Sequence, residues 1–152
     1  MSNLLKKEKG FTLIEIVLVL AIAGLLMVIV FLAVSGAQKS RRDTQRKNDV
    51  GRIAAAIESY ASNNNGTYPS NAVFPAAFWT SYVVSGNYSD PGSGTIYTPS
   101  AGAAAPVVPS GATSAGVVYN LATDCTGAAA GNRVYSVKIG LEQGGSACRD
   151  NH

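Results

Sequence analysis

The alternation of apolar and polar positions divides the first sixty residues into two parts. A basic leader is followed by an apolar run in which Ile16–Val34 contributes nineteen residues without a charge. That length is enough to cross the hydrocarbon core of a membrane as a helix. One acid, Glu15, lies at the start of the run, although a charge at mid-membrane costs about 2.5–3.5 kcal/mol. We therefore predict a membrane helix whose acid has a function.

The helix is predicted to continue beyond the apolar run, because no proline occurs from Phe11 to about Ser62. In its second half, apolar residues recur at steps of three and four, which marks one face of a helix. The residues on this face are Val50, Ile53, Ala54, Ile57, Tyr60 and Ala61. The segment Asn63–Gly66 is expected to end the helix, since Asn and Gly tolerate left-handed backbone. The first half is thus apolar all round, and the second half is amphipathic and suited to packing on a globular domain.

Residues 66–152 are expected to form that domain, which we call the head. A short helix is predicted over Pro75–Val84, and Gly94–Gly116 is predicted to be mostly loop because it is rich in Ala, Gly, Pro, Ser and Thr. Val117–Ala122 and Arg133–Leu141 are predicted strands, and the second alternates apolar and polar residues as a half-buried antiparallel strand does. We expect an α+β fold in which the long helix packs on a small antiparallel sheet.

The net charge of +3 is concentrated in two clusters on either side of the apolar run. The first contains Lys6, Lys7 and Lys9, and the second contains Lys39, Arg41, Arg42, Arg46, Lys47 and Arg52. We favour a solvated, partly self-paired helix surface for the second cluster, with Asp43–Lys47 and Asp49–Arg52 as helical pairs. Contact with nucleic acid or anionic lipid is the alternative. Because more basic residues follow the run than precede it, charge alone would place the head in the cytoplasm.

Two cysteines, Cys125 and Cys148, flank the second predicted strand. Outside the cytoplasm such a pair is most simply a disulfide, and two free thiols are the alternative. We expect no metal site, since the chain has two cysteines and a single histidine at its last position, His152. No Ser or Cys has a recognisable base partner, so we expect neither an enzyme nor a cofactor.

The segment Gly10-Phe11-Thr12-Leu13-Ile14-Glu15 resembles the junction of type IV prepilins and of type II secretion pseudopilins. In that family a prepilin peptidase cuts after the glycine and methylates the new N-terminus. The resemblance implies cleavage between Gly10 and Phe11, N-methylation of Phe11, and pairing of Glu15 with the Phe11 amine of an adjacent subunit. The alternative is that Glu15 lies at the membrane interface and extends its carboxylate to the headgroups. Farther along the chain, Gly24 and the segment Asn65–Pro69 also resemble family positions, although Val28–Ala37 lacks the proline that many pilins carry.

The resemblance also implies a domain organisation. Residues 1–10 would be a leader that is removed, and residues 11–37 the transmembrane or filament-core half of the helix. Residues 38–65 would be its amphipathic half, and residues 66–152 the head of a pilin fold, with a C-terminal region bounded by the disulfide. The prepilin junction places the leader in the cytoplasm and the cysteines suit an oxidising exterior, so we set the charge rule aside.

By the same resemblance, the chain is expected to be a structural subunit of a type IV pilus. It would wait in the cytoplasmic membrane as a single-pass precursor and then polymerise into an extracellular homopolymeric filament. Its partners would be the membrane, prepilin peptidase and an assembly machinery with a separate ATPase. The alternatives are a type II secretion pseudopilin and a minor pilin acting as an adhesin or DNA-binding tip subunit, whose partners would be a surface receptor or DNA.

Overall fold

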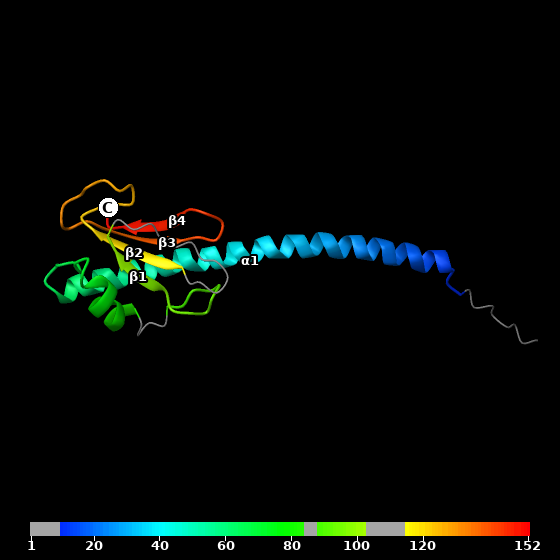
Figure 1. Cartoon of the computed structure of the whole chain (residues 1–152), viewed down its shortest axis with the longest axis horizontal. Helices are drawn as coiled ribbons and strands as arrows, with labels where there is room; N and C mark the ends of the chain where they lie inside the picture. The colour runs from blue at the N-terminus through cyan, green and yellow to red at the C-terminus, as the bar shows by residue number, and fades with distance from the viewer. Residues whose placement is uncertain (1–9, 84–87, 103–114) are drawn as a thin grey trace, which may run out of the picture. The chain divides into compact units, whose positions relative to one another are not determined.

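In a computed structural model of the chain, residues 10–83, 88–102 and 115–152 are described. The longest element is helix α1, which spans Leu13–Asn63 (Figure 1). The chain divides into two compact units, one ending at Gln38 and the other beginning at Lys39.

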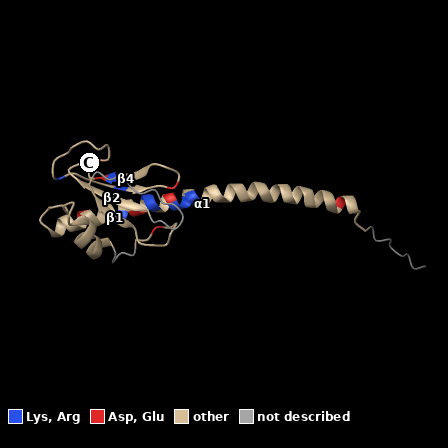
Figure 2. Cartoon of the chain, viewed as in Figure 1, with Lys and Arg blue, Asp and Glu red and all other residues tan. Residues whose placement is uncertain are grey.

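The first unit consists of the apolar part of α1. By length and composition, α1 is the one helix among the described residues that could cross a membrane, and none of its apolar window is buried within the chain. Figure 2 shows a single acid near the start of the helix, followed by a long stretch without charged residues. The predicted apolar helix is therefore present, and its side chains have no cover from the described part of the chain.

The second unit combines the rest of α1 with a π-helix and four strands. The π-helix η1 spans Phe74–Val83. The strands are β1 (Thr98–Ala101), β2 (Gly116–Leu121), β3 (Tyr135–Gly140) and β4 (Ser146–Asp150). They lie in the order β1-β2-β3-β4, with β1 parallel to β2 and the other two pairs antiparallel. The fold is α+β, as predicted.

Two expectations about the sheet were wrong. The sheet is mixed rather than antiparallel, because β1 runs parallel to β2. The prediction of mostly loop over Gly94–Gly116 missed β1, although residues 103–114 of that range lie outside the described part. β1 carries Pro99 and no apolar alternation, and a proline is tolerated there because β1 is an edge strand. The unpredicted β4 is the other edge strand, and its half-exposed residues likewise give no alternating signal.

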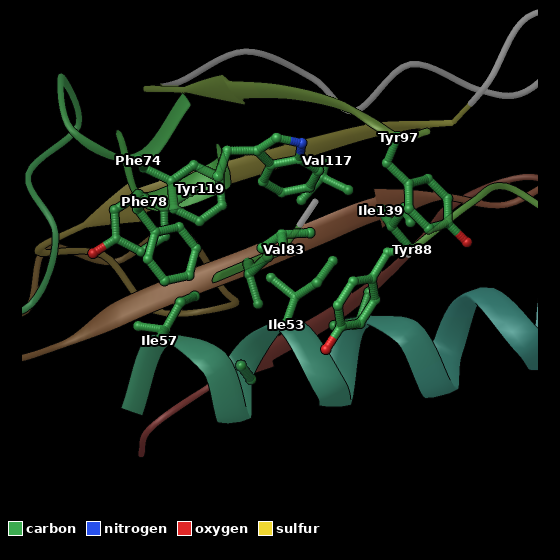
Figure 3. Packing of buried hydrophobic residues seen from close by; sticks show 14 of the residues in the cluster. Ile53, Ile57, Phe74, Phe78, Val83, Tyr88, Tyr97, Val117, Tyr119 and Ile139 are labelled. Atoms are coloured by element: carbon green, nitrogen blue, oxygen red, sulfur yellow. The ribbon is translucent and has the colours of Figure 1, made fainter. Parts of the chain in front are cut away.

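The core of the second unit lies between α1 and the sheet, as Figure 3 shows. The predicted helix face is confirmed: Ile53 and Ile57 are fully buried, and Tyr60 is half-buried at the margin. Aromatic rings from η1 fill the space beside them, and the Phe74 ring stacks on Tyr119 with centroids 4.3 Å apart. The Tyr119 hydroxyl donates to the backbone oxygen of Pro69 at 2.8 Å, so this buried polar group is satisfied.

Local chemistry accounts for the ends of the helices. The Gly66 amide donates to the Ala61 oxygen at 2.8 Å, and Asn65 and Gly66 both have positive φ, which confirms the predicted helix stop. The predicted short helix is present as η1, and position 84 lies outside the described residues. Its π geometry, in which the Phe78 amide donates to the Val73 oxygen at 3.1 Å, was not predicted.

Candidate functional site

The junction between Gly10 and Phe11 precedes α1 and is exposed. Phe11 is 81% exposed, and a Cβ added to Gly10 would meet no atom within 4 Å. A short, uncovered peptide before a helix is accessible to a processing enzyme.

Glu15 forms a local hydrogen-bond pair with Thr12 at the start of α1. The Thr12 amide and hydroxyl each donate to Glu15 Oε2 at 3.3 Å, and the Glu15 amide donates to Thr12 Oγ1 at 3.3 Å. This arrangement is a capping box, in which the first and fourth residues of a Thr-x-x-Glu sequence satisfy free backbone amides. The pattern was visible in the sequence, but the capping role was not predicted.

The capping box leaves the charge of Glu15 without a cation. Among the described residues, Glu15 is exposed and takes part in no ion pair. A carboxylate has about four acceptor positions, so the contacts with Thr12 leave room for a further donor. The predicted pairing with the Phe11 amine of a neighbouring subunit stays a prediction, and the carboxylate is sterically free to make it.

A second group of charges lies where α1 passes along the head, and it is centred on Arg46. We expected the basic stretch to be a solvated surface, and this is wrong for Arg46, whose side chain is fully buried. Its guanidinium donates to Asp90 Oδ1 at 2.6 Å, Asp43 Oδ1 at 2.9 Å and Glu142 Oε1 at 2.9 Å. A buried charge is tolerated only when it is paired and hydrogen-bonded, and here three carboxylates fulfil that condition.

Of the two ion pairs predicted within the helix, one is present and the other is not. Asp43 pairs with Arg46 instead of the predicted Lys47, which is exposed. The pair between Asp49 and Arg52 is present, with 3.4 Å between Asp49 Oδ1 and Arg52 Nη1. Arg46 and Asp43 both lie on the buried face of α1, whereas Lys47 is exposed on another face.

These charges form one group, which we call the Arg46 cluster and which attaches two turns of the head to α1. Its members are Arg42, Asp43, Arg46, Asp90 and Glu142. Glu142 receives two hydrogen bonds from Arg42, at 2.8 and 2.7 Å. Asp43 accepts from the backbone amides of Glu142 and Gln143, at 2.9 and 3.1 Å. The turn that holds Asp90 approaches closely, since a Cβ on Gly92 would lie 2.9 Å from Arg46 Nη2. Glycine is the residue that fits this approach.

These contacts shift the pKa values of the cluster. The hydrogen bonds from Arg42, helped by Arg46, lower the pKa of Glu142 to about 2. Burial opposes the charged form of Asp43, but the backbone and Arg46 hydrogen bonds outweigh it and lower its pKa. Burial likewise opposes the charge on Arg46, but Asp90 and Glu142 outweigh it and raise its pKa. Glu142, Asp43 and Arg46 therefore stay ionised at neutral pH.

Sequence reasoning missed the Arg46 cluster because its partners are distant. Asp90 and Glu142 lie 44 and 96 residues from Arg46 along the chain. One local signal existed: position 46 precedes Val50 by four residues and Ile53 by seven, and therefore lies on the apolar face of the helix. A cation on such a face predicts a buried partner, but not which acid supplies it.

The predicted disulfide between Cys125 and Cys148 is present in the structure. It joins β4 to the segment that follows β2, and the Cys125 amide also donates to Asp150 Oδ2 at 2.9 Å. His152 is exposed at the end of the chain. Within the described ranges, no group of three or more His, Cys, Asp or Glu residues is placed to hold a metal ion.

Comparison with known protein families bears on the N-terminal junction. The family model of the prokaryotic N-terminal methylation motif matches residues 5–31. The chain carries this motif. It is the class III signal of type IV pilins and pseudopilins, and the matched range includes Gly10, Phe11 and Glu15. It marks a structural, pilin-type group of proteins rather than a class of enzymes. No curated protein and no solved structure matches the chain.

The motif and the apolar helix together fit a membrane-anchored precursor that is processed by prepilin peptidase. The match ends at residue 31, within the first unit. The Arg46 cluster and the disulfide belong to the second unit and are described from the structure alone.

Proposed function

We propose that the chain is the structural subunit of a type IV pilus filament, held in the membrane by the first half of α1 and then polymerised into a helical fibre. The observation that carries the proposal is a methylation motif over residues 5–31 that extends into the exposed apolar half of α1. A helix that is apolar all round requires lipid or other helices around it. The membrane supplies lipid before assembly, and neighbouring subunits supply helices in the filament.

Processing would begin with hydrolysis of the peptide bond between Gly10 and Phe11. Removal of residues 1–10 creates an amine at Phe11, to which the same peptidase would transfer a methyl group from a separate methyl-donor molecule. The mature chain then begins at the exposed residue that immediately precedes the Thr12 cap. The new positive charge lies four positions before Glu15, close to the start of α1.

Glu15 would set the axial register of the filament by pairing with the Phe11 amine of the adjacent subunit. Charges attract far more strongly in a water-poor environment than at a wet surface. An unpaired carboxylate among apolar helices is correspondingly unfavourable, so each subunit is driven to the position that pairs it. The hydrogen bonds from Thr12 would orient the carboxylate without neutralising its charge.

A type II secretion pseudopilin is the second candidate, because pseudopilins carry the same methylation signal. A minor pilin that acts as an adhesin or DNA-binding tip subunit would also share it. These candidates differ from the main proposal in the location and abundance of the processed chain rather than in its N-terminal chemistry.

Blocking the cleavage tests the proposal. In Gly10→Val the precursor should accumulate in the membrane with residues 1–10 attached, and surface filaments should be lost. Gly51→Ala is the matched control, since a Cβ at that helix position meets nothing within 4 Å. It should be processed and assembled normally. Abundant filaments built from uncleaved Gly10→Val chains would overturn the proposal.

A further inference from the structure

We propose that Lys39 and Arg41 bind the phosphate headgroups of anionic phospholipids at the membrane surface from which the head emerges. The inference rests on the proposed function only in requiring that the first half of α1 spans a membrane. It concerns side chains that neither the methylation motif nor the head uses.

The basic residues of α1 fall into two groups in the structure. Arg42 and Arg46 are bound by acids of the cluster, and Arg52 pairs with Asp49 and lies 4.3 Å from the centre of the Tyr88 ring. The other three cations are exposed and form no ion pair or hydrogen bond among the described residues. They are Lys39, Arg41 and Lys47. These three are available to an external anion.

The neighbouring acid does not neutralise Lys39 and Arg41. Asp43 is the acid closest to them along α1, and it is buried. Its two oxygens accept hydrogen bonds from Arg46 and from the backbone amides of Glu142 and Gln143. Lys39 and Arg41 therefore carry positive charge that no acid among the described residues pairs with.

The position of these cations along α1 matches the headgroup layer. Lys39 and Arg41 follow Val34, the last residue of the uncharged apolar run, by five and seven positions. At about 1.5 Å per residue these separations are roughly 8 and 10 Å. The headgroup region on one side of a bilayer is about 5–8 Å thick, and long basic side chains extend along the helix to reach it. Lys47 lies roughly 12 Å farther along the helix than Lys39 and is beyond that layer.

The arrangement favours lipid over nucleic acid. Two positions along a helix correspond to a rotation of about 200°, so Lys39 and Arg41 project on nearly opposite sides of α1. Headgroups surround a membrane helix on all sides and can meet both cations at once. A nucleic-acid strand would require cations along one groove, together with aromatic stacking surfaces.

Lipid retention by the full mature chain tests the inference. The chain is placed in nanodiscs with equal amounts of phosphatidylglycerol and phosphatidylcholine, and the ratio of the two lipids that stay bound is measured by native mass spectrometry. The wild type should retain an excess of phosphatidylglycerol. Each basic residue near an anionic surface strengthens its attraction about fivefold, so the double variant Lys39→Gln/Arg41→Gln should lose roughly 25-fold of that excess. The control Lys47→Gln should keep it.

Several results would overturn the inference. An unchanged lipid ratio in the double variant would remove the site, as would an equal loss in Lys47→Gln. DNA retention by filaments that depends on Lys39 and Arg41, without any phosphatidylglycerol preference, would assign these residues to nucleic acid. Extraction of the wild-type chain from cell membranes by alkaline carbonate would refute membrane insertion itself, and hence the proposed function. A chain that resists extraction but shows no preference would refute the lipid site alone.

Discussion

The two halves of α1 differ in whether their charged and apolar side chains are exposed or have partners. From Leu13 to Gln38 the helix exposes its apolar side chains, and its one acid, Glu15, is exposed and pairs with no cation among the described residues. From Lys39 to Asn63 the same helix buries its apolar stripe in the core and encloses Arg46 among three carboxylates. In the second half the partners belong to the same chain. In the first half they are missing from the described residues.

This contrast shows which interactions folding completes and which it leaves for assembly. Most of the second half is satisfied once the head has folded, because its apolar stripe and the buried Arg46 find their partners within one chain. The exposed cations Lys39, Arg41 and Lys47 are the exception among the described residues. Nothing among the described residues satisfies the first half, and lipid or other subunits would supply what it lacks. The methylation motif lies in the unsatisfied half, as expected for a signal that prepares a subunit for polymerisation.

The largest expected effect separates the charge of Glu15 from its capping role. Gln can replace Glu in a capping box, so Glu15→Gln should keep the helix cap while removing the charge. We expect filaments to be lost, with the processed chain still in the membrane, as measured by surface shearing and membrane fractionation.

The reciprocal variant is the control for that prediction. Thr12→Val removes the cap, at a cost of about 1 kcal/mol, and keeps the carboxylate. Filaments should persist at reduced yield. Normal filaments in Glu15→Gln together with their loss in Thr12→Val would show that Glu15 acts only as a capping residue.

The next largest effect is expected in the second half of α1, from Lys39 to Asn63. Arg46→Ala would leave buried carboxylates unpaired and should destabilise the head by about 3–5 kcal/mol. The single tryptophan, Trp79, is buried in the core, so its fluorescence during denaturant unfolding reports the change. Lys47→Ala alters the neighbouring exposed cation and should stay within about 0.5 kcal/mol of the wild type. Equal stability of the two variants would show that the cluster does not hold the head on α1.

Removing the disulfide tests whether the second half of α1 depends on the stability of the head while the first half does not. Cys125→Ser/Cys148→Ser should destabilise the head by roughly 3 kcal/mol in the chain-entropy model. Hydrogen exchange of the full chain in detergent micelles should then increase from Lys39 to Asn63 and stay unchanged from Leu13 to Gln38. Faster exchange along the whole of α1 would mean that the two halves are not independent.

Acid should lower the stability of the head and of the second half of α1 that packs on it. This is the smallest of the expected effects. The pKa of Glu142 is lowered from its ordinary value of 4.5 to about 2 in the folded chain, and that of Asp43 is lowered too. Groups of this kind stabilise the fold fully above their unfolded pKa and lose that contribution as pH falls through the folded value. Head stability should therefore fall by about 2 kcal/mol between pH 4.5 and 2. Glu142→Gln should show a smaller fall, and an identical pH profile would exclude Glu142 as its source.

Much of this architecture was predictable because its signals are local. The apolar run, the stripe from Val50 to Ala61 and the stop at Asn63–Gly66 each depend on residues within a few turns of one another, and each was predicted correctly. The edge strands β1 and β4 were missed because edge strands need no apolar alternation. The capping role of Glu15 was missed although its partner Thr12 is only three positions away.

The Arg46 cluster could not be predicted in full, because it depends on the approach of loops that are distant in sequence. The step of four from Arg46 to Val50 indicates the buried face, but nothing near position 46 indicates Asp90 or Glu142. The N-terminal motif could be recognised for the opposite reason, because it is a short linear pattern, and the family model matches it over residues 5–31.

Intact mass of the chain in material sheared from the cell surface tests the central proposal most directly. We expect an abundant species running from Phe11 to His152, one methyl group heavier and two hydrogens lighter than the unmodified, reduced chain. Absence of that species from sheared material, with the processed chain confined to the membrane fraction, would contradict the pilus proposal and favour a pseudopilin.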